Sequence, residues 1–126
     1  MYEVSAGEGK YQVWLRLWDT SRGWYGSLTG GEEPHVGGVI LAVPRLSLTG
    51  SGQSCDIWPI TVPGHLDNDA VIPVAKQLCI KLGTTVSLTS GIHIEQAGAE
   101  DIARIRENCA AALALFFNCL QDCGHE

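Results

Sequence analysis

The sequence predicts an α+β fold: a mixed, mostly antiparallel sheet with two helices packed on one face. Five segments have the alternating or continuously apolar pattern of strands, and two carry apolar residues at helical spacing. In chain order they read β-β-β-β-α-β-α, which places most strands before the first helix, as α+β proteins do. The 126 residues suit one core, so residues 1–126 are expected to form a single domain.

The first two predicted strands form a hairpin. In residues 11–18 (YQVWLRLW), Val13, Leu15 and Leu17 alternate with the residues between them, which is the period of a half-buried strand. The segment DTSRG that follows is typical of a turn, and residues 24–29 can return as the second arm.

The next two predicted strands differ in how they can pair. Residues 36–43 (VGGVILAV) are apolar on both faces, as in a central strand. Gly37 and Gly38 within this strand indicate that something approaches the backbone closely there. Residues 55–62 (CDIWPITV) contain Pro59, which favours an edge strand or a bulge.

The two helices flank the last predicted strand, residues 84–90 (TTVSLTS). Asn68 or Asp69 is expected to cap the first helix, with Pro73 in its tolerated first turn. The longer helix, residues 99–120, has a predicted buried stripe of Ile102, Ile105, Cys109, Ala112 or Leu113, Phe116 and Leu120. Two helices can cover only one face of the sheet. Because Trp14 and Trp18 fall on the other, we expect a ligand or the second copy of a homodimer to cover it.

Composition excludes several classes of function. Eight Lys and Arg against 14 Asp and Glu give a net charge of −6, which argues against binding duplex nucleic acid or an anionic membrane and suits binding a cation. No stretch approaches the roughly 20 apolar residues of a membrane span. Residues 1–12 lack the pattern of a signal peptide, so we expect a cytoplasmic protein.

The five cysteines are not spaced as a disulfide framework, and most are expected to be buried free thiols. Cys119, Cys123 and His125 lie close together near the end of the chain. We interpret this trio as the frayed end of a helix rather than a metal site.

Three of the four histidines occupy similar loop positions: His35 in PHVGG, His65 in PGHLDND and His93 in GIHIEQ. A short connection joins residues 36–43 to residues 55–62, so these strands should be antiparallel, with His35 and His65 at one edge. The next connection contains a helix, so residues 55–62 and 84–90 should be parallel, which brings His93 to the same edge. The sequence therefore predicts that three imidazoles meet.

Grouped imidazoles beside carboxylates are typical of first-row metal sites, and Asp67, Asp69 and Glu95 could supply the carboxylate. Taken singly, each histidine is better explained as a loop residue that bonds to the backbone; taken together, the three favour a metal or ligand site. The ligand set suits zinc, manganese, iron and nickel alike. Arg45 and the hydroxyls of residues 47–54 could hold a phosphate, although a solvated loop explains them as well.

The three histidine motifs resemble those of the LpdD-like prenylated-flavin chaperones. These small bacterial proteins accompany UbiD-type decarboxylases and are related in fold to proteasome assembly chaperones. The resemblance rests on GGEEPHVGGVILAVP, PGHLDNDAVIPVAKQL and TTVSLTSGIHIEQAGAEDIARIREN, and covers residues 28–110. The family pattern reads PHIGAV, GHKDD and GIHIDN; this chain keeps the histidines and departs from the pattern at Leu66, Asn68 and Glu95.

The resemblance implies a metal-dependent carrier that binds prenylated flavin mononucleotide and delivers it to a UbiD-type decarboxylase. A metal on His35, His65 and His93 would leave positions open for phosphate oxygens. The implied flavin surface comprises Gly37, Gly38, Arg45, Trp58 and Asp67.

Two other functions remain open from the residues alone. A three-histidine metal can also activate water, so a small hydrolase with Glu95 or Asp67 as base is the alternative. In a metal-free assembly chaperone the histidines would only shape loops.

Overall fold

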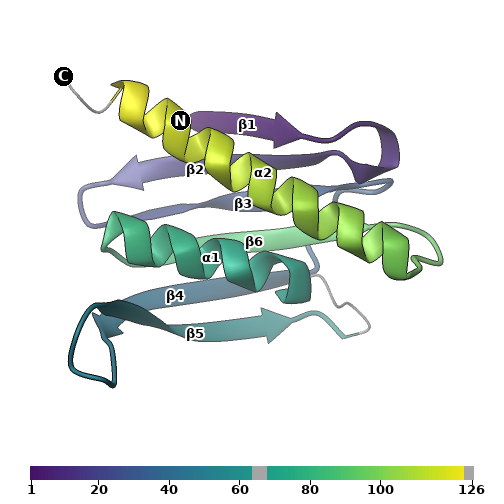
Figure 1. Cartoon of the computed structure of the whole chain (residues 1–126). Coiled ribbons are helices and arrows are strands. Elements are labelled where there is room, and N and C mark those ends of the chain that lie inside the picture. The colour runs from purple at the N-terminus through teal and green to yellow at the C-terminus, as the bar shows by residue number, and fades with distance from the viewer. Residues whose placement is uncertain (64–67, 124–126) are drawn as a thin grey trace.

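The computed structural model of the chain describes residues 1–63 and 68–123 (Figure 1). Its elements are β1 (Tyr2–Ala6), the short 3-10 helix η1 (Gly9–Tyr11), β2 (Val13–Thr20), β3 (Gly23–Gly31), β4 (Gly38–Leu46), β5 (Gln53–Thr61), α1 (Asn68–Leu82), β6 (Val86–His93) and α2 (Ala99–Cys123).

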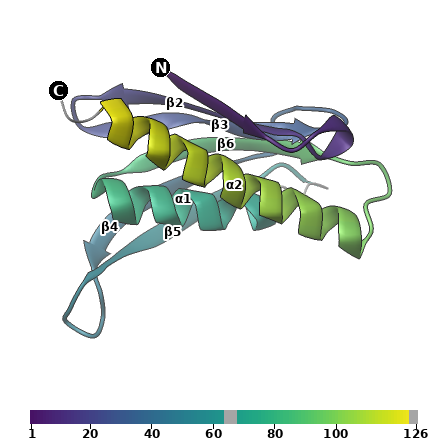
Figure 2. The same ribbon diagram turned by 45° about the horizontal axis from the view of Figure 1, so that its top comes forward.

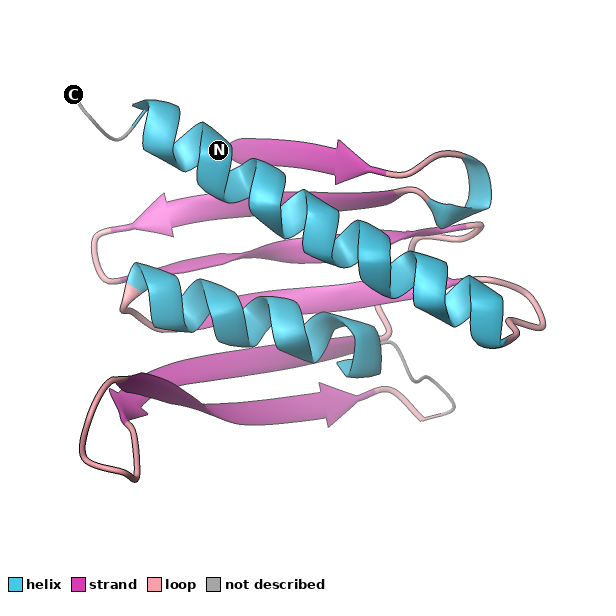
Figure 3. Ribbon diagram, in the orientation of Figure 1, coloured by secondary structure: helices cyan, strands magenta, loops and turns pink. Residues whose placement is uncertain are grey.

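The described strands form one sheet in the order β1-β2-β3-β6-β4-β5 (Figures 1 and 3). The pair β3 and β6 is parallel and the other four pairs are antiparallel. This confirms the predicted α+β class and its mostly antiparallel sheet. Since β5 and β6 both run antiparallel to β4, they are parallel to each other, as expected for strands joined through α1.

The sheet has one strand more than predicted, because β1 was not recognised. Tyr2, Val4 and Ala6 alternate with polar residues and pair with β2 in the register Tyr2↔Leu17. The alternation covers only five residues, which is too short to identify a strand without the neighbour it pairs with.

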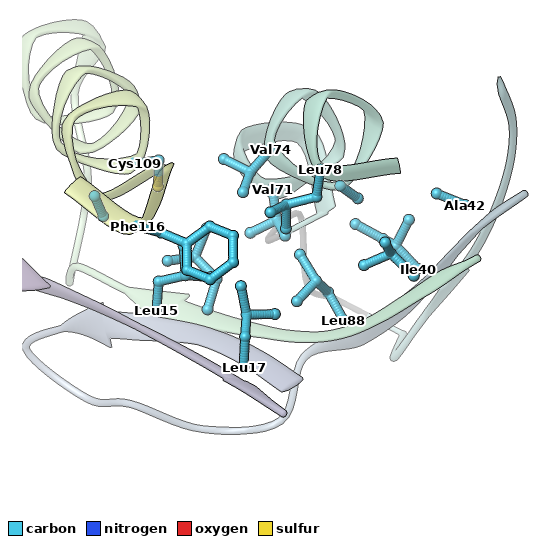
Figure 4. Close-up of a cluster of buried hydrophobic side chains, with 14 of the residues drawn as sticks. Leu15, Leu17, Ile40, Ala42, Val71, Val74, Leu78, Leu88, Cys109 and Phe116 are labelled. Carbon is cyan, nitrogen blue, oxygen red and sulfur yellow. The ribbon is translucent and has the colours of Figure 1, made fainter. Parts of the chain in front are cut away.

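Both described helices pack on the same face of the sheet, so that the core lies between them and the strands (Figures 2 and 4). Strands supply alternate residues, such as Leu15 and Leu17 from β2 and Leu88 from β6. The helices supply Val71, Val74, Ala75, Leu78 and Cys79 from α1 and Ile105, Cys109, Ala112 and Phe116 from α2.

Two details of the helix predictions were wrong. Ile102 is 47% exposed, because the first turns of α2 project past the end of α1 (Figure 2). Pro73 is the sixth residue of α1 rather than part of its first turn, because the helix already begins at Asn68. Pro73 therefore leaves the Asp69 carbonyl without its usual helical donor.

Pro59 lies in β5, the outermost strand next to β4, which confirms the predicted edge position. Among the described helices, none is long and apolar enough to cross a membrane.

Candidate metal and flavin site

Three strand ends meet at one edge of the sheet. The first residue of β4, Gly38, pairs with Thr61 at the end of β5 and with Ser90 near the end of β6. His93 is the last residue of β6, and His35 lies three residues before β4. The strand directions predicted from the connection lengths are therefore correct.

The backbone holds the segment around His35 against the end of β6. The Glu32 amide donates to the His93 carbonyl at 2.7 Å, and the Gly37 amide donates to the Ser90 carbonyl at 2.7 Å. A Cβ on Gly91 would lie 1.4 Å from the His35 carbonyl oxygen, so only glycine permits this approach. As a result, the His35 and His93 rings lie 6.1 Å apart between centroids, at 80° to each other.

Hydrogen bonds determine which ring nitrogen of each histidine carries a proton. Nδ1 of His35 is 2.8 Å from the Glu33 carbonyl oxygen, which can only accept, so Nδ1 carries the hydrogen. Nε2 of His93 is 3.1 Å from a carboxylate oxygen of Glu95 and donates to it in the same way. In the neutral rings the lone pairs are then on Nε2 of His35 and Nδ1 of His93.

The carboxylate of Glu95 contacts the His93 ring, and a second carboxylate, that of Glu32, bonds to the Glu95 backbone. The Glu95 amide donates to a carboxylate oxygen of Glu32 at 2.8 Å, which ties the loop after β6 to the loop before β4. A histidine whose second nitrogen donates to a carbonyl or carboxylate is the usual arrangement around a bound metal.

A buried group of hydrogen-bonded polar side chains, here called the buried junction, lies at the same end of the strands, on the face that the helices cover. Asn68 is 4% exposed, and its amide nitrogen donates to the Ile60 carbonyl at 3.2 Å and to the Thr61 hydroxyl at 3.0 Å. Its amide oxygen accepts from the fully buried Ser90 hydroxyl at 2.6 Å. A Cβ on Gly38 would lie 2.6 Å from that oxygen. The close approach predicted at Gly38 is thus made by the Asn68 side chain.

Only some of the remaining predicted site residues lie near the two histidines. His65 and Asp67 lie outside the described residues. Gly37 and Gly38 are buried at the edge itself. Trp58 lies on β5 and is 62% exposed, on the sheet face opposite the helices. Arg45 lies near the other end of β4, where its Nε donates to Asp56 at 2.7 Å, so the structure does not bring it near the histidines.

Among the side chains that the structure describes, no three or more His, Cys, Asp or Glu are grouped to hold a metal ion. Asp69 is exposed in the first turn of α1. At the end of α2 Cys119 is exposed, while His125 and the side chain of Cys123 lie outside the description.

A second polar region, not predicted from the sequence, lies between η1 and the start of α2. The Tyr11 hydroxyl donates to Asp101 at 2.6 Å, which raises the pKa of Tyr11 and lowers the pKa of Asp101. It borders an open cavity of about 490 Å³ whose lining includes Glu8, Glu107 and Asn108. These contacts join residues some 90 positions apart, so no local pattern could have indicated them.

Comparison of the sequence with protein families identifies the family of the chain. The prenylated flavin chaperone LpdD-like domain matches residues 7–121. The chain belongs to this family. The match extends beyond the resemblance seen at residues 28–110, and includes the β2–β3 hairpin and most of α2. No curated protein matches the chain.

Proposed function

We propose that this LpdD-like chain is a metal-dependent carrier of prenylated flavin mononucleotide that delivers the cofactor to a UbiD-type decarboxylase in the cytoplasm. The observation that carries the proposal is the placing of His35 and His93 side by side, each with an outer hydrogen bond that orients its ring. Family membership supports the flavin as the cargo.

The proposed site would hold a divalent transition metal through imidazole nitrogens. Nε2 of His35 and Nδ1 of His93 would be two ligands, and His65 is proposed as the third. Glu95 would orient the His93 ring, and Asp67 would supply a further carboxylate. The bound metal would attract the phosphate oxygens of the flavin nucleotide, which are hard anionic ligands.

The surface beside the histidines suits the rest of the cofactor. Trp58 presents an exposed indole on which a flavin ring can stack. It lies on β5, the strand whose last residue, Thr61, pairs with Gly38 at this edge. The buried backbone of Gly37 and Gly38 would border the phosphate.

Among the described residues, the site offers groups that can bind and orient a ligand. Glu95, a candidate base for the alternative metal-dependent hydrolase, contacts His93 itself and has its amide bonded to Glu32. A carrier needs reversible binding, which an exposed edge permits.

The proposal is tested by titrating the protein with reduced prenylated flavin mononucleotide, with and without divalent metals. We expect binding only in the presence of metal. For His93→Ala we expect the affinity for the flavin to fall by roughly tenfold to a hundredfold. His125→Ala is the matched control, because this histidine lies beyond the family match. Folded protein that binds no flavin with any metal would overturn the proposal, and ester hydrolysis abolished by a chelator would favour the hydrolase.

A further inference from the structure

The sheet face opposite the two helices, here called the open face, carries an unusual amount of exposed apolar surface. Figure 4 shows both helices on the other side of the sheet. The pairing register places Trp18, Tyr25, Ser87, Leu41 and Trp58 side by side across five strands. Tyr25 is 49% exposed and Leu41 is 38% exposed, and the Trp18 and Tyr25 rings stack at 5.5 Å.

The neighbouring row shows how charge is distributed over the open face. It runs from Arg16 through Ser27, Thr89 and Val39 to Ile60. Its one charged residue is at the margin, where Arg16 pairs with Glu3 of β1. A second ion pair, Arg45 with Asp56, lies at the far end of β4 and β5.

Aromatic and apolar side chains with charged residues at the rim are the composition of a protein–protein interface. The size of the open face agrees. Six strands about 4.8 Å apart and about eight residues long span on the order of 600 Å². A standard interface buries about 800 Å² on each partner, so the whole face is about as large as a stable dimer needs.

We infer that the open face is covered by the open face of a second copy of this chain. The small side chains Ser27, Ser87 and Thr89 occupy the middle strands, β3 and β6, with bulkier apolar groups on either side. A two-fold axis between β3 and β6 would place β2 of one copy against β4 of the other, and so Trp18 against Leu41, with Tyr25 against Ser87 beside the axis. The two flanks are therefore complementary, as an isologous dimer requires.

A second copy is favoured over the decarboxylase as the occupant. A carrier that releases its cargo spends part of its cycle apart from the enzyme, and an apolar face of this size would then be exposed to water. A second copy is always available. Trp58 lies on β5 at the end of the sheet, far from an axis between β3 and β6, so its indole is at the margin of the interface and stays accessible to a flavin.

The experiment is to measure the molar mass of the metal-free and flavin-free protein by sedimentation over a wide range of concentration. We expect a dimer, and for Leu41→Arg a dissociation constant raised by about tenfold or more. Leu115→Arg is the matched control: Leu115 is 42% exposed, but on α2, and its substitution should leave the dimer intact. Tyr25→Lys tests a second position, beside the axis, and guards against a folding defect in Leu41→Arg, with circular dichroism reporting the fold of each variant.

A monomer at all concentrations, including one that binds a decarboxylase through this face, would overturn the inference. A dimer dissociated by Leu115→Arg but not by Leu41→Arg or Tyr25→Lys would do the same. The measurement uses neither flavin nor metal, so it can fail or succeed independently of the proposed carrier function.

Discussion

At the scale of single residues, the Asn68–Ser90 hydrogen bond holds the site edge together. Its partners come from α1 and β6, and Asn68 also reaches the end of β5. Ser90→Ala would leave the buried amide oxygen of Asn68 without its donor, which costs about 1–3 kcal/mol of unfolding free energy. Chemical denaturation of Ser90→Ala should show this loss.

The matched control is Ser87→Ala in the same strand, whose side chain is half-buried on the open face. It should change the stability by less than about 0.5 kcal/mol. Equal effects of the two substitutions would show that the buried junction contributes nothing specific.

At the scale of elements, η1 is joined to α2 by the hydrogen bond from Tyr11 to Asp101, and this joint should depend on pH. The Tyr11 hydroxyl and the Gly98 amide lower the pKa of Asp101 from 3.8. The contribution of Asp101 to stability is therefore present above pH 3.8 and is lost as the pH falls through its lowered pKa in the folded protein. Tyr11 has a pKa raised from 10.0 by its bond to Asp101, so its contribution is present below 10.0 and is lost as the pH rises through the higher, folded value.

Tyr11→Phe should therefore destabilise the protein most between about pH 5 and pH 9, with the difference from the wild type shrinking at both extremes. Thermal unfolding across this range measures the effect. Tyr25→Phe, on the open face, is the control and should give a difference that does not change with pH. A constant difference for Tyr11→Phe as well would mean that the bond does not couple to folding.

The same elements show what a sequence can predict. Strand directions around His35 and His93 followed from connection lengths alone, because a short connection and a helical one leave few alternatives. The start of α1 was predicted closely, but the role of Asn68 was not, because its side chain bonds to β5 and β6 instead of capping its own helix. Contacts of that kind join distant parts of the chain and leave no periodic pattern.

At the scale of the whole molecule, the buried thiols can test whether the chain unfolds as one unit. Cys55 on β5, Cys79 on α1 and Cys109 on α2 belong to one apolar cluster. Burial raises the pKa of Cys79 to about 11 and that of Cys109 to about 12, from 9.0. At neutral pH the Cys109 thiolate is then much scarcer than in an ordinary thiol, and its side chain is only 1% exposed, so reaction requires unfolding.

The experiment uses native protein that carries Cys123→Ser. Because Cys119 is exposed on α2, we expect a thiol reagent to label it at the rate of an accessible thiol. The three buried cysteines should react far more slowly and with the same dependence on denaturant, because one cooperative transition exposes them all. Mass spectrometry of the labelled peptides separates the sites. If Cys109 became reactive at lower denaturant than Cys55 and Cys79, α2 would detach before the rest of the core unfolds. The single-domain prediction requires instead that α2, α1 and β5 lose their protection together, since their side chains fill the same space between helices and sheet.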